Sequence, residues 1–440
     1  MEKGNARLAA LAALGKCRKS GAWSDAVLGS VMDSHNLDSR ERALCTALCF
    51  SVQQHMLFLD HAINCYSATK TAKLEPKVLD ILRLGACQIF FMDKIPASAA
   101  VNESVKICRS SGMSRASGLV NAVLRRISEN KENIPEPKCT ELEKLSVKHS
   151  FPLELTKYLH KILGSECESF MAACNDSAPI TAQVNPLKTT TDALMSAFSE
   201  NGVEASLHPY LPDCIVLGSV GAVTALPGFS EGHFYIQDTA AKLSVMAAAP
   251  QKGSKILDTC SAPGGKSFAS AILSGGAEII SCDLHENKLK RIRESAERLG
   301  IENLATRCAD GRVFIPEFEE NFDVVITDVP CSGLGVIRKK PDIRYKSIAE
   351  FDALPAIQLD ILRNSSRYVK CGGTLLYSTC TVRPEENEDI VDSFLRENSE
   401  FERVDFALCG NIASERGMLT LYPHIHRTDG FFIAKLRKKV

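Results

Sequence analysis

Apolar residues recur at helical spacing over the first third of the chain. They do so in the segments 6–17, 37–63, 76–92 and 118–130. Positions three and four residues apart lie on one face of a helix, and strand-type alternation is rare in these segments. We therefore predict an all-helical domain over residues 1–133.

A charged stretch with two prolines, "ENKENIPEPKCTELEK", follows at 129–144 and is typical of a linker. Beyond it, "ITAQVNPLKTT" and "CIVLGSVGAV" have the composition of strands, and the helical "TDALMSAFSENG" lies between them. These signals predict a linker and a small α/β subdomain over 134–236.

From residue 237 to residue 440, strand-like segments alternate with helical ones. That alternation favours a parallel, doubly wound sheet with helices on both faces. The predicted fold class is therefore multidomain, with an all-α first domain, a small α/β middle part and a Rossmann-like last domain.

The composition restricts the class of protein. Lys and Arg number 52 against 53 Asp and Glu, so no overall positive field attracts nucleic acid, and any such partner needs a local patch. No apolar run approaches the roughly 18 residues of a membrane span. The 17 cysteines include no C-x-x-C pair, which favours free thiols in a reducing cytoplasm over a zinc site. We expect no metal and no membrane.

The segment "DTCSAPGGKS" places glycines at a strand-to-helix turn. Such a turn lets a ligand approach the backbone, although the spacing fits neither G-x-G-x-x-G nor the P-loop. Asp283 ends the next strand, 19 residues after Gly264, where this architecture holds ribose hydroxyls. Asp310 follows and is placed to reach an adenine amine. Together they indicate an adenosine derivative; taken singly, each is equally typical of a turn or a helix cap.

Two cysteines follow two later strands. Cys331 comes after "FDVVITDVP" and Cys380 after "LLYST". Most cysteines are small core residues, but neighbouring parallel strands lie about 4.8 Å apart, so both thiols are expected to face one pocket. The acids Glu385 and Glu386 after Pro384 suit the first turn of a helix.

A thiolate, a carboxylate and an adenosine-bearing cofactor suit one reaction. Addition of a thiolate to carbon 6 of cytosine makes carbon 5 nucleophilic toward the methyl group of S-adenosylmethionine. A carboxylate near ring nitrogen 3 stabilises the developing charge. A second acid–base group assists loss of the carbon 5 proton and of the adduct. Spacing alone does not say which thiol is the nucleophile.

At these residues the chain resembles a known family. "DTCSAPGGKS", "DVPCSGLGVIRKKPDIRY", "YSTCTVRPEENE" and "HRTDGFFIAKLRK" are similar, in order and spacing, to the motifs of the NOL1/NOP2/Sun family of RNA cytosine-C5 methyltransferases, over about 145–440. The start, with "IPASAAVNESVKI" and "GLVNAVLRRI", resembles the NusB-type RNA-binding domain. This fusion resembles the bacterial enzymes that methylate cytosine 967 of 16S ribosomal RNA.

The resemblance implies roles for individual residues. Cys380 is the expected nucleophile, Cys331 assists release of the adduct, and Asp328 contacts the target base. The implied contacts to S-adenosylmethionine are Cys260, Ser261, Ala262, Pro263, Gly264, Gly265, Lys266, Asp283, Asp310 and Asp328. Ser261 replaces a usual alanine, and Lys339 and Lys340 replace a usual arginine–histidine pair, without affecting the chemistry.

The partner implied is 16S ribosomal RNA, bound by the helical domain and the α/β subdomain of a monomer. Candidate RNA contacts are basic residues near Cys331 and on the predicted helix 118–130; they are Arg338, Lys339, Lys340, Arg344, Arg125 and Arg126. Two alternatives stay open: the same reaction on transfer RNA, and a non-catalytic RNA-binding factor of ribosome assembly.

Overall fold

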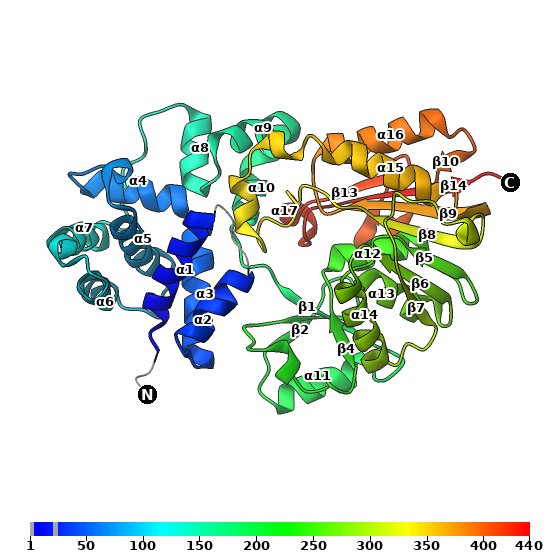
Figure 1. Cartoon of the computed structure of the whole chain (residues 1–440), viewed down its shortest axis with the longest axis horizontal. Coiled ribbons are helices and arrows are strands. Elements are labelled where there is room, and N and C mark those ends of the chain that lie inside the picture. Colours follow the sequence, from blue (N-terminus) through cyan, green and yellow to red (C-terminus); the bar gives the residue numbers. More distant parts are fainter. Residues whose placement is uncertain (1–3, 21–24) are drawn as a thin grey trace. The chain divides into compact units, whose positions relative to one another are not determined.

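The computed structural model describes residues 4–20 and 25–440 (Figure 1). The chain divides into two compact units. The first contains the residues up to Asn175 together with Lys340–Ser347, and the second contains Asp176–Lys339 and Ile348–Val440. The segment 340–347 thus packs within the first unit, although its neighbours in the sequence belong to the second.

The first unit is built from helices over its described residues. Its α-helices are α1 (Ala6–Ser20), α2 (Asp25–Ser34), α3 (Ser39–Gln54), α4 (Met56–Tyr66), α5 (Pro76–Phe91), α6 (Ala97–Ser110), α7 (Ser117–Glu129), α8 (Glu141–His149), α9 (Leu153–Leu163) and α10 (Cys167–Ala173). Short 3-10 helices are η1 (Thr71–Lys73), η2 (Ser114–Ala116), η3 (Gly164–Glu166) and η6 (Pro341–Tyr345). The apolar stripe predicted over 37–63 forms two helices, α3 and α4, which meet at His55.

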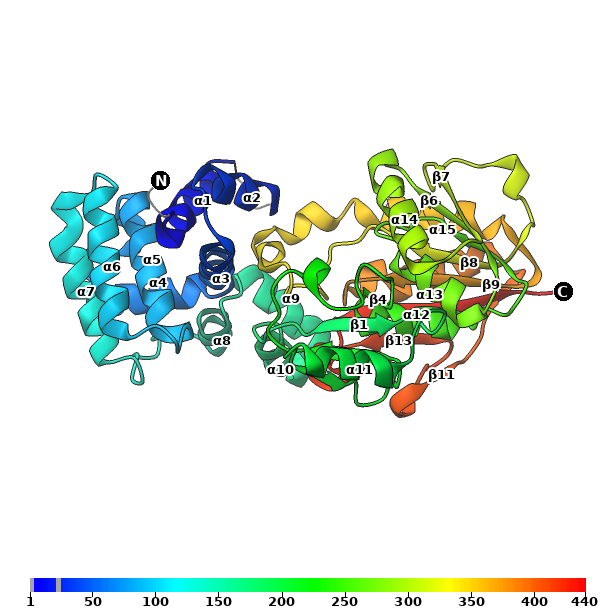
Figure 2. The same cartoon turned by 90° about the horizontal axis from the view of Figure 1, so that it is seen from below.

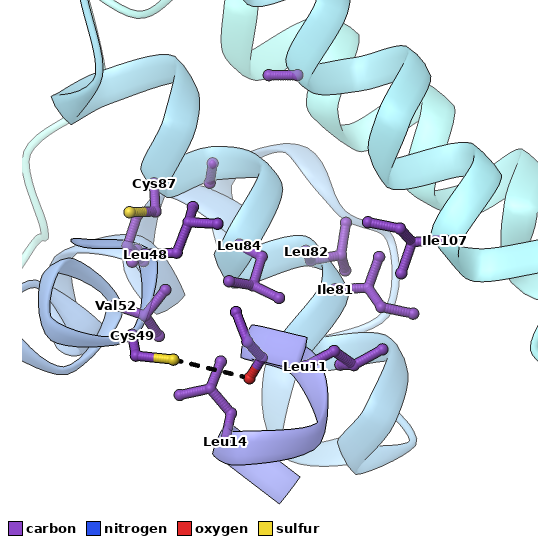
Figure 3. Close-up of a cluster of buried hydrophobic side chains, with 14 of the residues drawn as sticks. Leu11, Leu14, Leu48, Cys49, Val52, Ile81, Leu82, Leu84, Cys87 and Ile107 are labelled. Carbon is purple, nitrogen blue, oxygen red and sulfur yellow. Dashed lines mark hydrogen bonds between the residues drawn. The ribbon is translucent and has the colours of Figure 1, made fainter. Parts of the chain in front are cut away.

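Local signals start several of these helices. The side chain of Asp38 accepts a hydrogen bond from the Glu41 N–H at the start of α3. Thr140 and Glu143 form a capping box at the start of α8. Figure 3 shows the core of this unit, in which Leu11, Leu48 and Leu84 come from α1, α3 and α5. Cys49 and Cys87 lie among them as small core residues.

The second unit starts with a small antiparallel sheet in the order β2-β3-β1-β4. Its elements are β1 (Ile180–Val184), α11 (Thr191–Glu200), β2 (Ala205–Leu207), β3 (Cys214–Leu217), η4 (Val223–Ala225) and β4 (Phe234–Ile236). Leu194 and Phe198 of α11 pack with the buried face of this sheet. This part has the α/β character predicted for the middle of the chain.

An eight-stranded sheet organises the rest of the second unit, in the order β10-β14-β9-β8-β5-β6-β7 with β13 beside β14. Its strands are β5 (Lys255–Asp258), β6 (Glu278–Asp283), β7 (Leu304–Cys308), β8 (Phe322–Asp328), β9 (Val369–Thr379), β10 (Phe401–Arg403), β13 (Met418–Leu421) and β14 (Phe431–Lys438). Strands β5 to β9 are parallel, as predicted, whereas β10, β13 and β14 pair antiparallel. The sheet is therefore mixed, with a parallel part and an antiparallel edge.

Helices cover both faces of this sheet. One face packs against α12 (Thr239–Ala248), α13 (Gly265–Ser274) and α14 (Glu286–Leu299). The other packs against α15 (Leu354–Ser366) and α16 (Glu388–Glu397). Figure 1 shows these two sets on opposite sides of the strands, and Figure 2 views the side with α12 and α13. Neighbouring residues of β8 alternate between the two cores, with Val324 in one and Val325 in the other.

The remaining elements are short connections. They are η5 (Pro316–Phe318), η7 (Ile348–Phe351), η8 (Pro384–Glu386), η9 (Cys409–Asn411), α17 (Pro423–His426) and the paired strands β11 (Ala407–Leu408) and β12 (Ile412–Ala413). The predicted helix start at Pro384 is wrong in detail, because Pro384–Glu386 form the separate turn η8 and α16 begins at Glu388.

Candidate active site

A cavity of about 500 Å³ opens at the carboxyl ends of the parallel strands. Strand order reverses at β5, which lies between β6 and β8, and open α/β sheets bind ligands at such a point. The cavity brings together many of the residues singled out in the sequence; those lining it are Cys260, Ala262, Asp283, Asp310, Asp328, Cys331 and Cys380.

The glycine loop connects β5 to α13. Gly264 has φ +104°, and a Cβ there would lie 2.7 Å from the Phe268 ring, so a glycine is required. Ser261 is buried, and its hydroxyl donates to the Cys282 carbonyl at 2.9 Å. Of the predicted loop contacts, Cys260 and Ala262 line the cavity, whereas Ser261 supports the loop from behind.

Two carboxylates line the side of the cavity near β6 and β7. Asp283 accepts hydrogen bonds from the main-chain N–H groups of Ala262 at 3.3 Å and His285 at 3.0 Å. Asp310 accepts hydrogen bonds from the backbone and guanidinium of Arg312, which hold the pKa of this carboxyl below its ordinary value. Asp310 is therefore an ionised acceptor for a ligand hydroxyl or amine.

Asp328 ends β8 between two donors. Lys266 Nζ lies 2.6 Å from its Oδ2 atom, and the Ser378 hydroxyl donates to its Oδ1 atom at 2.8 Å. The ammonium of Lys266 also lies 5.0 Å from the centre of the Phe431 ring. These contacts fix the carboxylate at the cavity wall while part of it stays accessible, with the side chain 30% exposed.

The two predicted thiols meet in the cavity. The Sγ atoms of Cys331 and Cys380 are 3.1 Å apart, so one thiol donates a hydrogen bond to the other sulfur. That hydrogen bond, burial and the nearby negative charges of Glu386 and Asp328 raise the pKa of Cys331 well above its ordinary value. Burial and these charges disfavour the thiolate form of Cys331.

Three buried residues support the site without having been predicted. Asp258 accepts a hydrogen bond from the Ser267 hydroxyl at 2.7 Å beneath the glycine loop. Gln358 of α15 donates to Glu386 and to the Pro330 carbonyl. Asp258 and Glu386 stand inside motifs recognised in the sequence, whereas nothing in the local sequence distinguishes Gln358.

The basic run after Cys331 is mostly not an open surface. Arg338 and Lys339 form ion pairs with Asp238 and Asp429. Arg344 is fully buried within the first unit, where it donates to main-chain carbonyls, including that of Gln54 at 2.7 Å. Burial contradicts the RNA contact expected at Arg344, whereas Arg338 and Lys339 are engaged in ion pairs and the Lys339 side chain stays 32% exposed.

The other three predicted RNA contacts, Lys340, Arg125 and Arg126, are exposed. They are the most exposed members of the predicted set.

Comparisons with known proteins agree with this geometry. Residues 245–437 match the family described as 16S rRNA methyltransferase RsmB/F, residues 4–129 match the NusB family, and residues 151–224 match the ferredoxin-like domain of RsmF/B-like methyltransferases. A probable ribosomal RNA small subunit methyltransferase B of Bacillus subtilis is 35% identical over the whole length of both chains. This chain belongs to the ribosomal RNA small subunit methyltransferase B family.

Other relatives give the same family. Ribosomal RNA small subunit methyltransferase B of Escherichia coli is 31% identical over 92% of each chain. The crystal structure of PH0851 superposes with a TM-score of 0.79 and 27% identity over 99% of this chain and 98% of that one. Membership of the family confirms the predicted fold class, the prediction of a methyltransferase and the prediction of S-adenosylmethionine as its cofactor.

The part of the chain that the structure describes contains no cluster of three His, Cys, Asp or Glu side chains suited to a metal ion. Within those same residues, no helix has the length and apolar character needed to cross a membrane.

Proposed function

We propose that this chain methylates carbon 5 of one cytosine of 16S ribosomal RNA, cytosine 967 in the usual numbering, through a covalent adduct with Cys380. The observation that carries the proposal is the hydrogen-bonded pair of Cys331 and Cys380 beside Asp328 at the edge of the cofactor cavity. Ribosomal RNA as the substrate class is supported by the family and by the names of the relatives.

Cys380 is the proposed nucleophile. Its sulfur is in hydrogen-bond contact with Cys331, and the raised pKa of Cys331 disfavours the thiolate on that partner. The Cys380 thiolate adds to carbon 6 of the cytosine, and carbon 5 becomes nucleophilic. S-adenosylmethionine, when bound, supplies the methyl group to carbon 5.

Asp328 is proposed to face ring nitrogen 3 and the amino group of the base. Its pairing with Lys266 and Ser378 holds the carboxylate in one orientation, so little reorganisation is needed as charge develops on the base. After methylation, carbon 5 loses its proton to water, the electron pair of that bond restores the double bond between carbons 5 and 6, and Cys380 leaves carbon 6 as a thiolate. Cys331 contacts the Cys380 sulfur and, as a protonated thiol, is proposed to assist this release by hydrogen bonding to the leaving thiolate.

The cofactor is held by the loop after β5 and by the acids after β6 and β7. Asp283 is suited to ribose hydroxyls and Asp310 to the adenine amine, because both are acceptors on the cavity wall. The remaining proposed contacts are Cys260, Ser261, Ala262, Pro263, Gly264, Gly265, Lys266 and Asp328. Lys340, Arg125 and Arg126 are the proposed RNA contacts, and a monomer acting in the cytoplasm is part of the proposal.

Methyl transfer from tritiated S-adenosylmethionine to 16S ribosomal RNA tests the roles of the two thiols. The wild type should incorporate label, Cys380→Ala should incorporate none, and Cys331→Ala should accumulate a slowly migrating protein–RNA band on a denaturing gel. Cys371→Ala is the matched control, because Cys371 is an exposed cysteine of β9. Full activity in Cys380→Ala would refute the nucleophile, and an adduct trapped by Cys380→Ala instead would reverse the two roles.

Bisulfite sequencing of RNA from a strain lacking this chain tests the target. Loss of 5-methylcytosine at one position of 16S ribosomal RNA is expected. Loss confined to transfer RNA would show that the substrate is a different RNA, and an unchanged map would favour a non-catalytic assembly factor.

A further inference from the structure

Glu386 lies at the end of the turn η8, and its side chain is fully buried. Its Oε2 atom accepts two hydrogen bonds, from the Ser332 main-chain N–H and from Gln358 Nε2, each at 2.8 Å. Gln358 Nε2 also donates to the Pro330 carbonyl at 2.9 Å. The residues on both sides of Cys331 are therefore tied, directly or through Gln358, to one carboxylate oxygen.

The same turn holds the segment that carries Cys380. The Tyr377 hydroxyl donates to the Glu386 carbonyl at 2.6 Å. Asn387, the next residue, accepts from the Thr379 hydroxyl at 2.6 Å and donates to the Thr381 carbonyl at 3.1 Å. Residues 386 and 387 thus hold the chain before and after Cys380 while the Glu386 side chain holds the chain around Cys331.

A role in starting the helix does not explain this arrangement. Glu386 lies in the separate turn η8, and α16 begins only at Glu388. The side chain of its neighbour Glu385 is 39% exposed, whereas that of Glu386 is buried. Burial of a carboxylate is costly unless several donors compensate it. Two hydrogen bonds to Oε2, and the Arg383 guanidinium 3.7 Å from Oε1, provide that compensation for Glu386.

We propose that Glu386 is a positioning residue for the thiol pair: its carboxylate joins the Cys331 segment to the Cys380 segment and keeps the two sulfur atoms in contact. This inference rests on the proposed function, because it assigns Glu386 to the step in which Cys331 assists release of the adduct. Loss of the hydrogen bonds to Glu386 is expected to slow release of the covalent adduct, while Cys380 still attacks the base. A displacement of about 1 Å at a reacting group costs on the order of a hundredfold in rate.

The fraction of RNA trapped as covalent adduct distinguishes a positioning role of Glu386 from a general effect on the stability of the fold. Glu386→Ala removes the acceptor for Ser332 and Gln358, so the fraction of RNA trapped as adduct should rise at least about tenfold over wild type. Glu386→Gln places an amide oxygen where Oε2 lies and retains both hydrogen bonds, so it should release RNA almost as wild type does. Glu385→Ala is the matched control in the same turn and should leave adduct and turnover unchanged.

Gln358→Leu provides a second route to the same loss, because it removes the donor that joins Glu386 to Pro330. It should trap adduct as well, and it decides the question if Glu386→Ala does not fold. Adduct trapped by Cys331→Ala but by neither Glu386→Ala nor Gln358→Leu would overturn the positioning role. If Cys331→Ala itself traps none and the wild type transfers no label, the proposed function fails instead.

Discussion

The sulfur atoms of Cys331 and Cys380 lie 3.1 Å apart, although 49 residues separate them in the chain. The contact forms because β8 and β9 are adjacent parallel strands, with Asp328 opposite Ser378 in the register. Cys331 follows Asp328 by three residues and Cys380 follows Ser378 by two, so both thiols lie just beyond the same edge of the sheet. The hydrogen bond between the two thiols is the largest cause of the raised pKa of Cys331.

Alkylation of Cys331 should respond to the loss of Cys380. Cys380→Ala removes the hydrogen bond, so the pKa of Cys331 should fall and its thiolate fraction at a fixed alkaline pH should rise, about tenfold for each unit of pKa. Iodoacetamide labelling followed by mass spectrometry of the peptide that contains Cys331 measures the rate. The exposed Cys371 serves as an internal reference.

The Cys380→Ser variant separates pKa from access. Serine leaves nearly the same space open as alanine but retains a hydroxyl that can form a hydrogen bond with Cys331. The pH at which the labelling rate rises should therefore move less in Cys380→Ser than in Cys380→Ala. Equal labelling of Cys331 in the wild type and in both variants at every pH would contradict the assigned cause.

The proximity of the two thiols could be predicted from the sequence. Each cysteine directly follows a recognisable strand, and the alternation of strands with helices predicts that these strands are parallel. The hydrogen bond from Gln358 to Glu386 could not be predicted, because Gln358 belongs to α15 and reaches the site only through the packing of that helix. The acids after Pro384 looked alike in the sequence. Burial distinguishes them, with Glu386 inside and Glu385 at the surface.

The basic run after Cys331 illustrates a second limit. Charge alone predicts exposure, but Arg338 and Lys339 find Asp238 and Asp429, which are about 90 to 100 residues distant in the chain. Arg344 is buried because carbonyl oxygens of the helical unit converge on its guanidinium. Ion-pair and hydrogen-bond partners so distant in the chain cannot be recognised from the residues next to the cations.

Binding of 16S ribosomal RNA should depend on salt through the exposed cations of α7. Replacement of Arg125 and Arg126 by glutamine should weaken binding and reduce the slope of log affinity against log salt by about 1 for each phosphate that is no longer neutralised. Filter binding at several salt concentrations measures both. An unchanged slope would remove this pair from the RNA interface.

The comparison variant for that experiment is Arg344→Met. Replacement of the arginine leaves buried acceptors, including the Gln54 carbonyl and Asn175 Oδ1, without a donor. The free energy of unfolding should therefore fall by about 1–3 kcal/mol. The salt slope of RNA binding should stay as in the wild type, because this side chain is buried.

Asp258 should make the stability of the second unit depend on pH. Burial raises the pKa of this carboxyl to about 7, whereas in an unfolded chain it titrates near 4. Between these values the folded chain holds a proton that the unfolded chain has released. The free energy of unfolding contributed by Asp258 therefore falls as pH rises from about 4 to about 7 and is level above that.

Asp258→Asn keeps an acceptor for Ser267 but cannot titrate, so urea unfolding across this range should show a smaller decline than in the wild type. Asp310→Asn should have the opposite effect on the pH dependence of the unfolding free energy, because the lowered pKa of Asp310 adds stability as pH rises. Parallel declines in the wild type and in Asp258→Asn would contradict a raised pKa at Asp258.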